Sequence, residues 1–174
     1  MTPDVSVRRA DSSDARLLAS LGARTFSETF ASENTPEDMA AYLQSAFSHA
    51  QLTAELSDAH SIFFVAEATG EAAGYAKLYE GDLRPDCLTG VRAVELVRLY
   101  VLQRWLGRGV GRALMQRCMD EARRAGYSTM WLGVWERNRR AQAFYRKCGF
   151  RPVGERIFQL GSDAQTDWLM ERAL

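Results

Sequence analysis

Residues 94–126 constrain the fold more than any other part of the chain. They begin with a run rich in β-branched and aromatic residues, 94–101, which is typical of a strand. The segment 107–111 then has glycine at every second position. Apolar residues follow at helical spacing as far as Gly126, and a glycine there can end a helix in the left-handed conformation. The pattern therefore predicts a strand, a glycine loop and a helix.

This arrangement is suited to binding a phosphate group. Glycines let backbone N–H groups turn toward a ligand without a Cβ in the way, and a helix N-terminus adds unpaired donors and a partial positive charge. Arg104, Arg108 and Arg112 add full positive charges in the same loop. The alternative is a tight turn whose glycines only permit close packing of strand and helix. The three arginines favour the phosphate site.

The spacing of the glycines restricts the kind of phosphate ligand. A nucleotide P-loop ends in Gly-Lys-Ser/Thr, whereas Gly111 is followed by Arg112 and Ala113, so this class is excluded. A dinucleotide site has the pattern G-x-G-x-x-G and an acidic residue that binds the ribose. Here the pattern is G-x-G-x-G, and Glu136, which could supply the acid, lies far downstream. A dinucleotide-binding protein remains an alternative.

Two segments resemble the signatures of the GCN5-related N-acetyltransferase (GNAT) family. Residues 99–101 and 107–114 resemble its acetyl-CoA motif, and residues 138–150 match its second signature, N-x-x-A-x-x-F-Y-x-x-x-G-F. The family often has Arg or Gln where this chain has Leu106. Because backbone N–H groups hold most of the pyrophosphate in such loops, we expect Leu106 to be tolerated. The resemblance implies acetyl-CoA as cosubstrate and no metal.

The resemblance also implies which residues bind the cosubstrate. Backbone N–H groups near Tyr100 and Val101 would face the thioester oxygen if this strand bulges away from the next one. Asn138 is expected both to cap the next helix and to contact the cosubstrate. The full predicted set is Leu99, Tyr100, Val101, Leu106, Gly107, Arg108, Gly109, Val110, Gly111, Arg112, Asn138, Ala141, Phe144 and Tyr145.

Acetyl transfer by direct attack in a ternary complex needs a base, because a free alkylamine titrates near pH ~10. Glu95 is the predicted base. Strand alternation puts it on one side with Val97, Leu99 and Val101, so its carboxylate lies on an apolar face and burial should raise its pKa. Its place four residues before Leu99 also resembles the catalytic glutamate of the histone acetyltransferases. Pairing of Glu95 with an arginine such as Arg92 and a solvated strand end are the alternatives, and water could relay the proton or replace the base.

Tyr145 is the predicted acid that protonates the departing thiolate, as the family's tyrosine at this motif position does. The alternative is that Tyr145 only packs in the core, since it shares a helix face with Ala141 and Phe144.

The acceptor is predicted to be a primary amine. Glu28, Phe30 and Tyr75 are the expected acceptor-binding residues, since acids with aromatic rings suit a cation through charge pairing and cation–π contact. The segments 25–30, 74–78 and 165–167 resemble the PaiA-type polyamine acetyltransferases, which implies a polyamine such as spermidine or spermine. A protein or peptide amine stays open as acceptor. A protein of another class, a CoA-binding regulatory domain without turnover, also stays open.

The rest of the chain predicts an α/β (α+β) fold in one domain, residues 1–174. The element order β-α-α-β-β-β-α-β-α-β-β is that of the GNAT fold, a mixed, mostly antiparallel sheet of about seven strands with about four helices. The expected strands are 5–8, 62–66, 74–79, 94–101, 130–134, 150–160 and 165–171. The expected helices follow the capping residues Asp11, Thr35 and Asn138 and the glycine loop.

Composition argues against several other classes. The formal net charge is zero, so nothing favours a nucleic acid or an acidic membrane surface. The three cysteines are widely spaced, with no disulfide or metal pattern, and His49 and His60 are isolated. The first residues do not resemble a signal peptide and no long apolar run exists, so we expect a cytoplasmic protein. A homodimer is a further expectation, because such families often form one.

Overall fold

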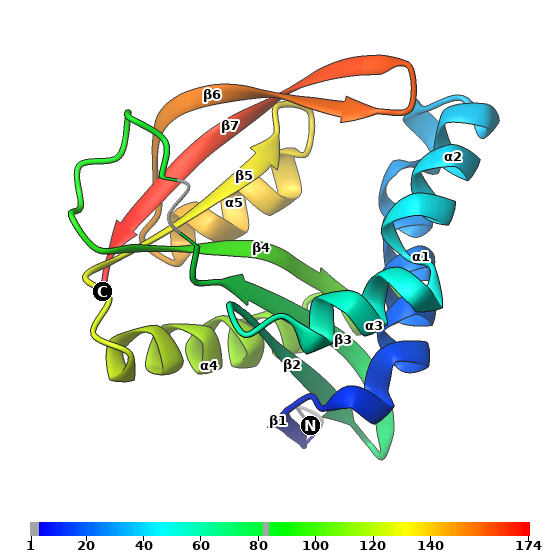
Figure 1. The fold of residues 1–174 in the computed structure, drawn as a ribbon, viewed down its shortest axis with the longest axis horizontal. Helices are drawn as coiled ribbons and strands as arrows, with labels where there is room; N and C mark the ends of the chain where they lie inside the picture. The colour runs from blue at the N-terminus through cyan, green and yellow to red at the C-terminus, as the bar shows by residue number, and fades with distance from the viewer. Residues whose placement is uncertain (1–3, 82–83) are drawn as a thin grey trace.

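A computed structural model describes residues 4–81 and 84–174 and is built on a seven-stranded sheet of order β1-β2-β3-β4-β5-β7-β6 (Figure 1). The strands are β1 Val5–Arg9, β2 Ser61–Ala68, β3 Glu71–Tyr79, β4 Ala93–Val101, β5 Thr129–Trp135, β6 Arg151–Leu160 and β7 Asp163–Ala173. The helices are α1 Ala15–Phe30, α2 Pro36–Ala46, α3 His49–Ser57, α4 Val110–Arg124 and α5 Arg139–Lys147. Neighbouring strands are antiparallel except β4 and β5, which are parallel. The predicted mixed, mostly antiparallel sheet is confirmed.

Helix ends lie where local capping signals predicted them. Thr35 Oγ1 accepts a hydrogen bond from the N–H of Asp38 at 3.2 Å, one residue before α2 begins. Asn138 Oδ1 accepts one from the N–H of Ala141 at 3.1 Å at the start of α5. Gly126 follows α4 with a φ of +80°. These three predictions are confirmed.

Two details of the helices differ from expectation. Asp11 caps a short 3-10 turn, Ser12–Asp14, which comes before α1. The helix α3 was not predicted, so residues 4–81 and 84–174 contain five α-helices where about four were expected. Ser48 Oγ accepts a hydrogen bond from the N–H of Gln51 at 3.1 Å, and this Ser-x-x-Gln spacing is a capping-box signal that marks the start of α3. Gly81, Pro85 and Gly90 also predict a loop between the strands 74–79 and 94–101, and its residues 82–83 lie outside the described ranges.

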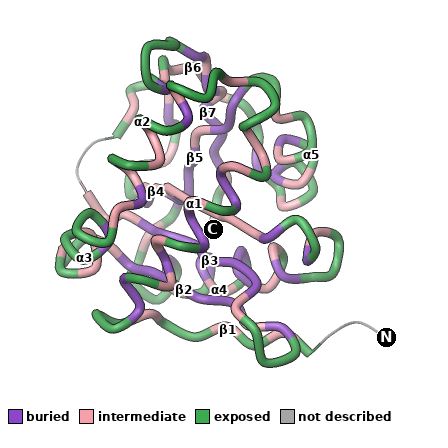
Figure 2. Tube along the Cα trace, turned by 90° about the vertical axis from the view of Figure 1, so that its right-hand side faces the viewer, coloured by how far each residue is buried: buried purple, intermediate pink, exposed green. Residues whose placement is uncertain are grey.

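Helices cover both faces of the sheet. α4 packs against β1–β4, whereas α1 and α3 pack against β2–β4 from the opposite side. Figure 2 shows buried backbone along the central strands and exposed backbone in the outer turns. β5 is buried along most of its length, as its continuous apolar run predicted.

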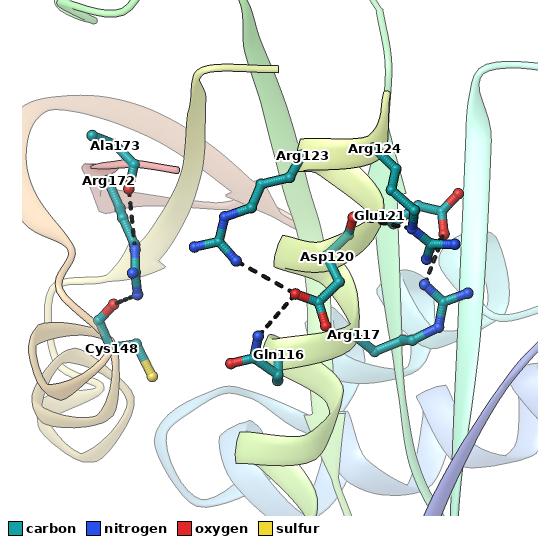
Figure 3. A network of polar contacts seen from close by, with 9 residues as sticks. All are labelled: Gln116, Arg117, Asp120, Glu121, Arg123, Arg124, Cys148, Arg172 and Ala173. Atoms are coloured by element: carbon teal, nitrogen blue, oxygen red, sulfur yellow. Dashed lines mark hydrogen bonds and ion pairs between the residues drawn. The ribbon is translucent and has the colours of Figure 1, made fainter. Parts of the chain in front are cut away.

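The outer side of α4 carries charged pairs rather than core residues (Figure 3). Arg117 contacts Glu121 at 2.8 Å, and the amide of Gln116 donates to Asp120 at 2.9 Å. Pairs of this kind stabilise a helix by only ~0.2–0.5 kcal/mol each. The position of α4 is therefore set by its buried face. In the same view, Arg172 of β7 donates to the carbonyl of Cys148 just after α5.

The sheet opens between β4 and β5. The two strands pair only where Ala93, Val94 and Glu95 lie beside residues 129–131. Beyond that point β5 continues along β7, and β4 continues along β3. Figure 1 shows β4 and β5 diverging toward α1. The predicted separation of this strand from the next one is therefore present, and it creates the site described below.

Candidate active site

A cavity of about 770 Å³ occupies the divergence of β4 and β5. This volume lies within the ~300–1,000 Å³ that is usual for small-molecule sites. Residues of α4, α5 and the glycine loop line one end. Residues of α1, α2, β6 and β7 line the other end. The cavity therefore connects the two sides of the sheet, and we call these ends the loop end and the acceptor end.

The glycine loop presents backbone donors at the loop end. Gly107 has a φ of +74° and Gly109 a φ of +90°, in the left-handed region that favours glycine. The helical hydrogen bonds of α4 begin with the N–H of Ala113, which donates to the carbonyl of Gly109 at 3.0 Å. The N–H groups of residues 110–112 therefore have no acceptor within the helix and are available to a phosphate.

Most of the predicted cosubstrate-binding residues line this cavity. They are Leu99, Tyr100, Val101, Leu106, Gly107, Gly109, Gly111, Arg112, Asn138, Ala141, Phe144 and Tyr145. Two of the predicted residues do not line it. Val110 is fully buried, and the guanidinium of Arg108 lies 5.7 Å from the centre of the Trp105 ring. Only the backbone of Val110 and the charge of Arg108 can contribute to binding from these positions.

β4 contains a β-bulge at Val97. Arg98 pairs with Lys77 and Leu96 pairs with Leu78, which leaves Val97 as the extra residue. Residues that pair directly across two strands share a face of the sheet, and a bulge shifts the alternation by one position.

The bulge places Glu95 on a different face from the one predicted. Simple alternation put Glu95 beside Val97, Leu99 and Val101, and this expectation is wrong because the bulge interrupts the two-residue period. Glu95 instead shares a face with Tyr100, whose ring contacts Phe26 of α1 at 6.5 Å between centroids. The carboxylate is thus on the acceptor side of the sheet.

Glu95 has a partner from the far strand of the sheet. Its side chain is 17% exposed, and Arg156 Nη1 of β6 donates a hydrogen bond to Glu95 Oε1 at 3.2 Å. Burial raises the pKa of Glu95, and Arg156 opposes part of that rise. The pairing with Arg92 does not form, because Arg92 donates to the carbonyl of Ala125. Arg156 lines the cavity, whereas Glu95 does not.

Asp167 of β7 is a second carboxylate at this position, and it lines the cavity directly. One of its oxygens lies 3.7 Å from Arg156 Nε, and the residue is 7% exposed. Burial raises the pKa of Asp167, with Arg156 acting in the opposite direction. Asp167 is not among the site residues predicted from the sequence. The signal was an acidic residue at an inward-facing position of β7, between the buried Gln165 and Leu169.

Tyr145 lines the cavity from α5. Its ring packs against Phe144 at 5.5 Å and Phe150 at 5.9 Å between centroids. Burial raises its pKa well above the usual range, so the phenol is protonated at neutral pH. Tyr145 therefore packs in the core, as the alternative proposed, and also faces the cavity, while its role as the acid stays a prediction.

Of the three predicted acceptor-binding residues, Phe30 lines the cavity and two are elsewhere. Tyr75 is 0% exposed inside the core. Glu28 accepts hydrogen bonds from the N–H of Gln103 at 2.8 Å and from Arg24 Nε at 3.0 Å. Glu28 therefore attaches α1 to the segment before the glycine loop. Position in the sequence was misleading here, because Glu28 lies only two residues from the cavity-lining Phe30 and yet its carboxylate contacts Gln103 and Arg24.

Within residues 4–81 and 84–174, no group of three or more His, Cys, Asp or Glu side chains is placed to hold a metal ion. In the same residues, no helix is both long and apolar enough to cross a membrane.

The comparisons with known proteins agree with this geometry. The model of the acetyltransferase (GNAT) family matches residues 23–150. The chain belongs to the GNAT family. It is an acetyl-CoA-dependent N-acetyltransferase, and the loop end of the cavity fits the diphosphate of that cosubstrate through the backbone donors of residues 110–112.

Two similar GNAT proteins span nearly the whole chain. An uncharacterised N-acetyltransferase of Mycobacterium tuberculosis is 37% identical over 92% of this chain and 98% of its own. An uncharacterised N-acetyltransferase of Lactobacillus delbrueckii subsp. lactis is 33% identical, with 98% of each chain covered.

A solved GNAT structure, the PaiA N-acetyltransferase of Thermoplasma acidophilum in complex with coenzyme A, has a TM-score of 0.76. It is 19% identical to this chain and covers 98% of it and 99% of its own length. At this identity the likeness shows the fold alone.

Proposed function

We propose that this N-acetyltransferase acts on a primary amine, by direct attack of the amine on the acetyl group within a ternary complex. The observation that carries the proposal is the cavity that extends from the glycine loop to the buried carboxylate of Asp167. Acetyl-CoA supplies the acetyl group as a reactive thioester. The N–H groups of residues 110–112 would hold its phosphates, and Leu99, Val101 and Asn138 would line its pantetheine arm.

In this proposal Glu95 accepts the proton that the amine nitrogen loses. The raised pKa of Glu95 makes it a better base near neutral pH than an ordinary carboxylate. Because Arg156 lines the cavity and its partner Glu95 does not, we infer that a water molecule carries the proton from the nitrogen to Glu95. As the nitrogen–carbon bond forms, the carbon–sulfur bond breaks.

Tyr145 gives its phenolic proton to the departing sulfur. Its position on the cavity wall supports this role, and its raised pKa means that the phenol carries its proton at neutral pH. Backbone N–H groups near Tyr100 and Val101 are the proposed donors to the thioester oxygen, because β4 has left β5 at these residues.

A polyamine and a peptide amine are the two narrower acceptors suggested by the sequence. The polyamine was inferred from Glu28 and Tyr75 among others, and neither of these lines the cavity. The proposed acceptor class is therefore the primary amine, and the test includes both a polyamine and a peptide amine.

A thermal melt with acetyl-CoA, and in parallel with NADH, tests the cosubstrate. A ligand at 100 times its Kd stabilises by ~2.7 kcal/mol, or roughly 5–10 °C for a domain of this size. We expect this rise with acetyl-CoA and none with NADH; the reverse result would refute the proposal. The release of CoA thiol is then measured with and without a panel of amines. Release that requires an amine is expected, whereas binding without amine-dependent release would indicate a regulatory domain.

A further inference from the structure

Five aromatic side chains enclose the acceptor end of the cavity. They are Phe26 and Phe30 of α1, Tyr42 of α2, Trp135 of β5 and Phe158 of β6. Each ring contacts the next, with centroid distances of 4.4 Å for Phe26–Phe30, 4.6 Å for Phe26–Tyr42, 5.5 Å for Tyr42–Phe158 and 5.6 Å for Phe30–Trp135. The rings therefore form one continuous apolar wall drawn from four different elements.

The charges at this end are few and almost all paired. Asp167 is the one acidic side chain among the described residues that line the cavity. It shares Arg156 with Glu95, so two acids around one arginine leave a single excess negative charge. Arg98, the other arginine at this end, is held by Glu55 at 2.7 and 3.0 Å, and Lys77 shares the same carboxylate at 2.9 Å. Among the described residues that line the cavity, Asp167 is thus the single carboxylate that can pair with a cation, and a polycation finds no second one there.

The β6–β7 hairpin lines the acceptor end, and its tip reaches the region of α2 (Figure 1). Gln165 Nε2 of β7 donates to Asn34 Oδ1 at 2.6 Å, and the N–H of Ser162 donates to Asp38 Oδ1 at 2.6 Å. These bonds fix the hairpin to the α1–α2 corner. Residues of α1, α2, β6 and β7 thus bound the acceptor end on several sides, which favours a compact acceptor over an extended one.

We propose that the acceptor is a compact monoamine whose nitrogen is bound by the Asp167 carboxylate and whose apolar or aromatic body packs against the ring wall. This inference rests on the proposed function. A protonated amine gains both the charge pairing and the attraction of the surrounding rings for a cation. Burial of the apolar body against the rings is favourable, whereas a hydrophilic polyamine chain has less apolar surface to bury. Asp167 is then a specificity-determining residue that touches the substrate.

A panel of three amines tests the substrate class, with thiol release measured under the same conditions. The probes are 2-phenylethylamine, spermidine and a short lysine-containing peptide. We expect kcat/KM for 2-phenylethylamine to exceed that for spermidine by at least about tenfold, the effect of roughly 1.4 kcal/mol of differential binding. A preference for spermidine or the peptide would overturn this inference and leave the proposed function intact. No amine-dependent release with any probe would overturn the proposed function itself.

Two variants test the residues. Asp167→Asn should lower kcat/KM for 2-phenylethylamine at least about tenfold, mainly by raising KM. The exposed Glu155→Gln of β6 is the matched control and should leave it unchanged. The rise in melting temperature with acetyl-CoA, measured on both variants, should equal that of the parent and shows that the loop end is intact. Equal kinetics for both variants would overturn the role of Asp167.

Phe158→Leu tests the ring wall without removing a charge. It should reduce the ratio of kcat/KM for 2-phenylethylamine over n-butylamine, because the aromatic body loses more contact than the short alkyl chain. An unchanged ratio would show that the acceptor body does not lie against Phe158.

Discussion

Arg156 and Glu95 form an ion pair at 3.2 Å that joins β6 to β4, two strands that are not neighbours in the sheet. The guanidinium crosses the Trp131 ring at 5.7 Å from its centre. Gly133 makes room for it, since a Cβ there would lie 2.6 Å from Arg156 Nη2. The arginine is therefore held over β5, where its positive charge partly neutralises the carboxylates of Glu95 and Asp167. Both carboxylates nevertheless keep raised pKa values, because burial outweighs the arginine.

Removal of the base should slow the reaction. Glu95→Gln keeps the size of the side chain and a hydrogen-bond acceptor for Arg156 but cannot take a proton. We expect kcat to fall by about 10², at the low end for general base catalysis because water can accept the proton instead. The measurement is kcat for the preferred amine, with Glu155→Gln as the control. A loss below about twofold would show that water alone is the base.

The pH dependence of kcat/KM should report the raised pKa of Glu95. The active form is the carboxylate, so activity should rise with pH through a pKa above the ordinary 4.5 of a glutamic acid. Asp167 faces the same arginine, and burial raises its pKa too, so the acid limb belongs to the pair. An acid limb at or below the ordinary value would contradict the burial of Glu95.

Arg156→Gln tests whether the arginine helps to set the pKa that the acid limb of the pH profile reports. Its positive charge lowers the pKa of both carboxylates, so its loss should move the acid limb to higher pH. The pH profile of the variant is compared with that of the parent. A shift to lower pH would refute the assigned interaction.

Loss of the phenol should affect turnover and leave cosubstrate binding unchanged. Tyr145→Phe retains the ring contacts with Phe144 and Phe150 and removes only the hydroxyl. We expect kcat to fall by about 10²–10⁴, with the acetyl-CoA-induced rise in melting temperature preserved. If the rise disappears as well, the hydroxyl binds the cosubstrate and the assigned role as acid is wrong.

The loop glycines should differ in their tolerance of alanine. Gly109 has a φ of +90°, where an L-residue is strained by about 1–2 kcal/mol, so Gly109→Ala should lower the melting temperature by roughly 2–8 °C. Gly111 is not in this region, and a Cβ there would meet the Phe144 ring at an ordinary 3.5 Å. Gly111→Ala is therefore the matched control and should melt close to the parent. Equal melting temperatures for the two variants would contradict the loop conformation.

Asp167→Asn should change how stability depends on pH. The folded-state pKa of Asp167 is raised above 3.8, so its contribution to stability is complete below that value and is lost as pH rises through the folded-state pKa. Asparagine has no such loss. The melting temperature of the variant relative to the parent should therefore be higher at about pH 8 than at about pH 4. A difference that does not change with pH would mean that burial does not disfavour the ionised form.

The sequence determined those features whose signals lie within a few residues of one another. The caps at Thr35 and Asn138, the glycine loop and the helix that follows it were all predictable because each depends on local hydrogen bonds or local backbone angles. The cavity-lining position of Tyr145 was predictable for the same reason, through a signature confined to one helix and its ends.

Only the tertiary structure decided which side chains meet at the acceptor end. The bulge at Val97 moved Glu95 to the opposite face, and a bulge depends on how β4 pairs with β3. Arg156 reaches Glu95 across 61 residues of sequence, and Asp167 joins them from β7. Tyr75 and Glu28, in contrast, are directed to the core and to the loop. These outcomes depend on strand register and packing between distant segments, which no local pattern of residue types encodes.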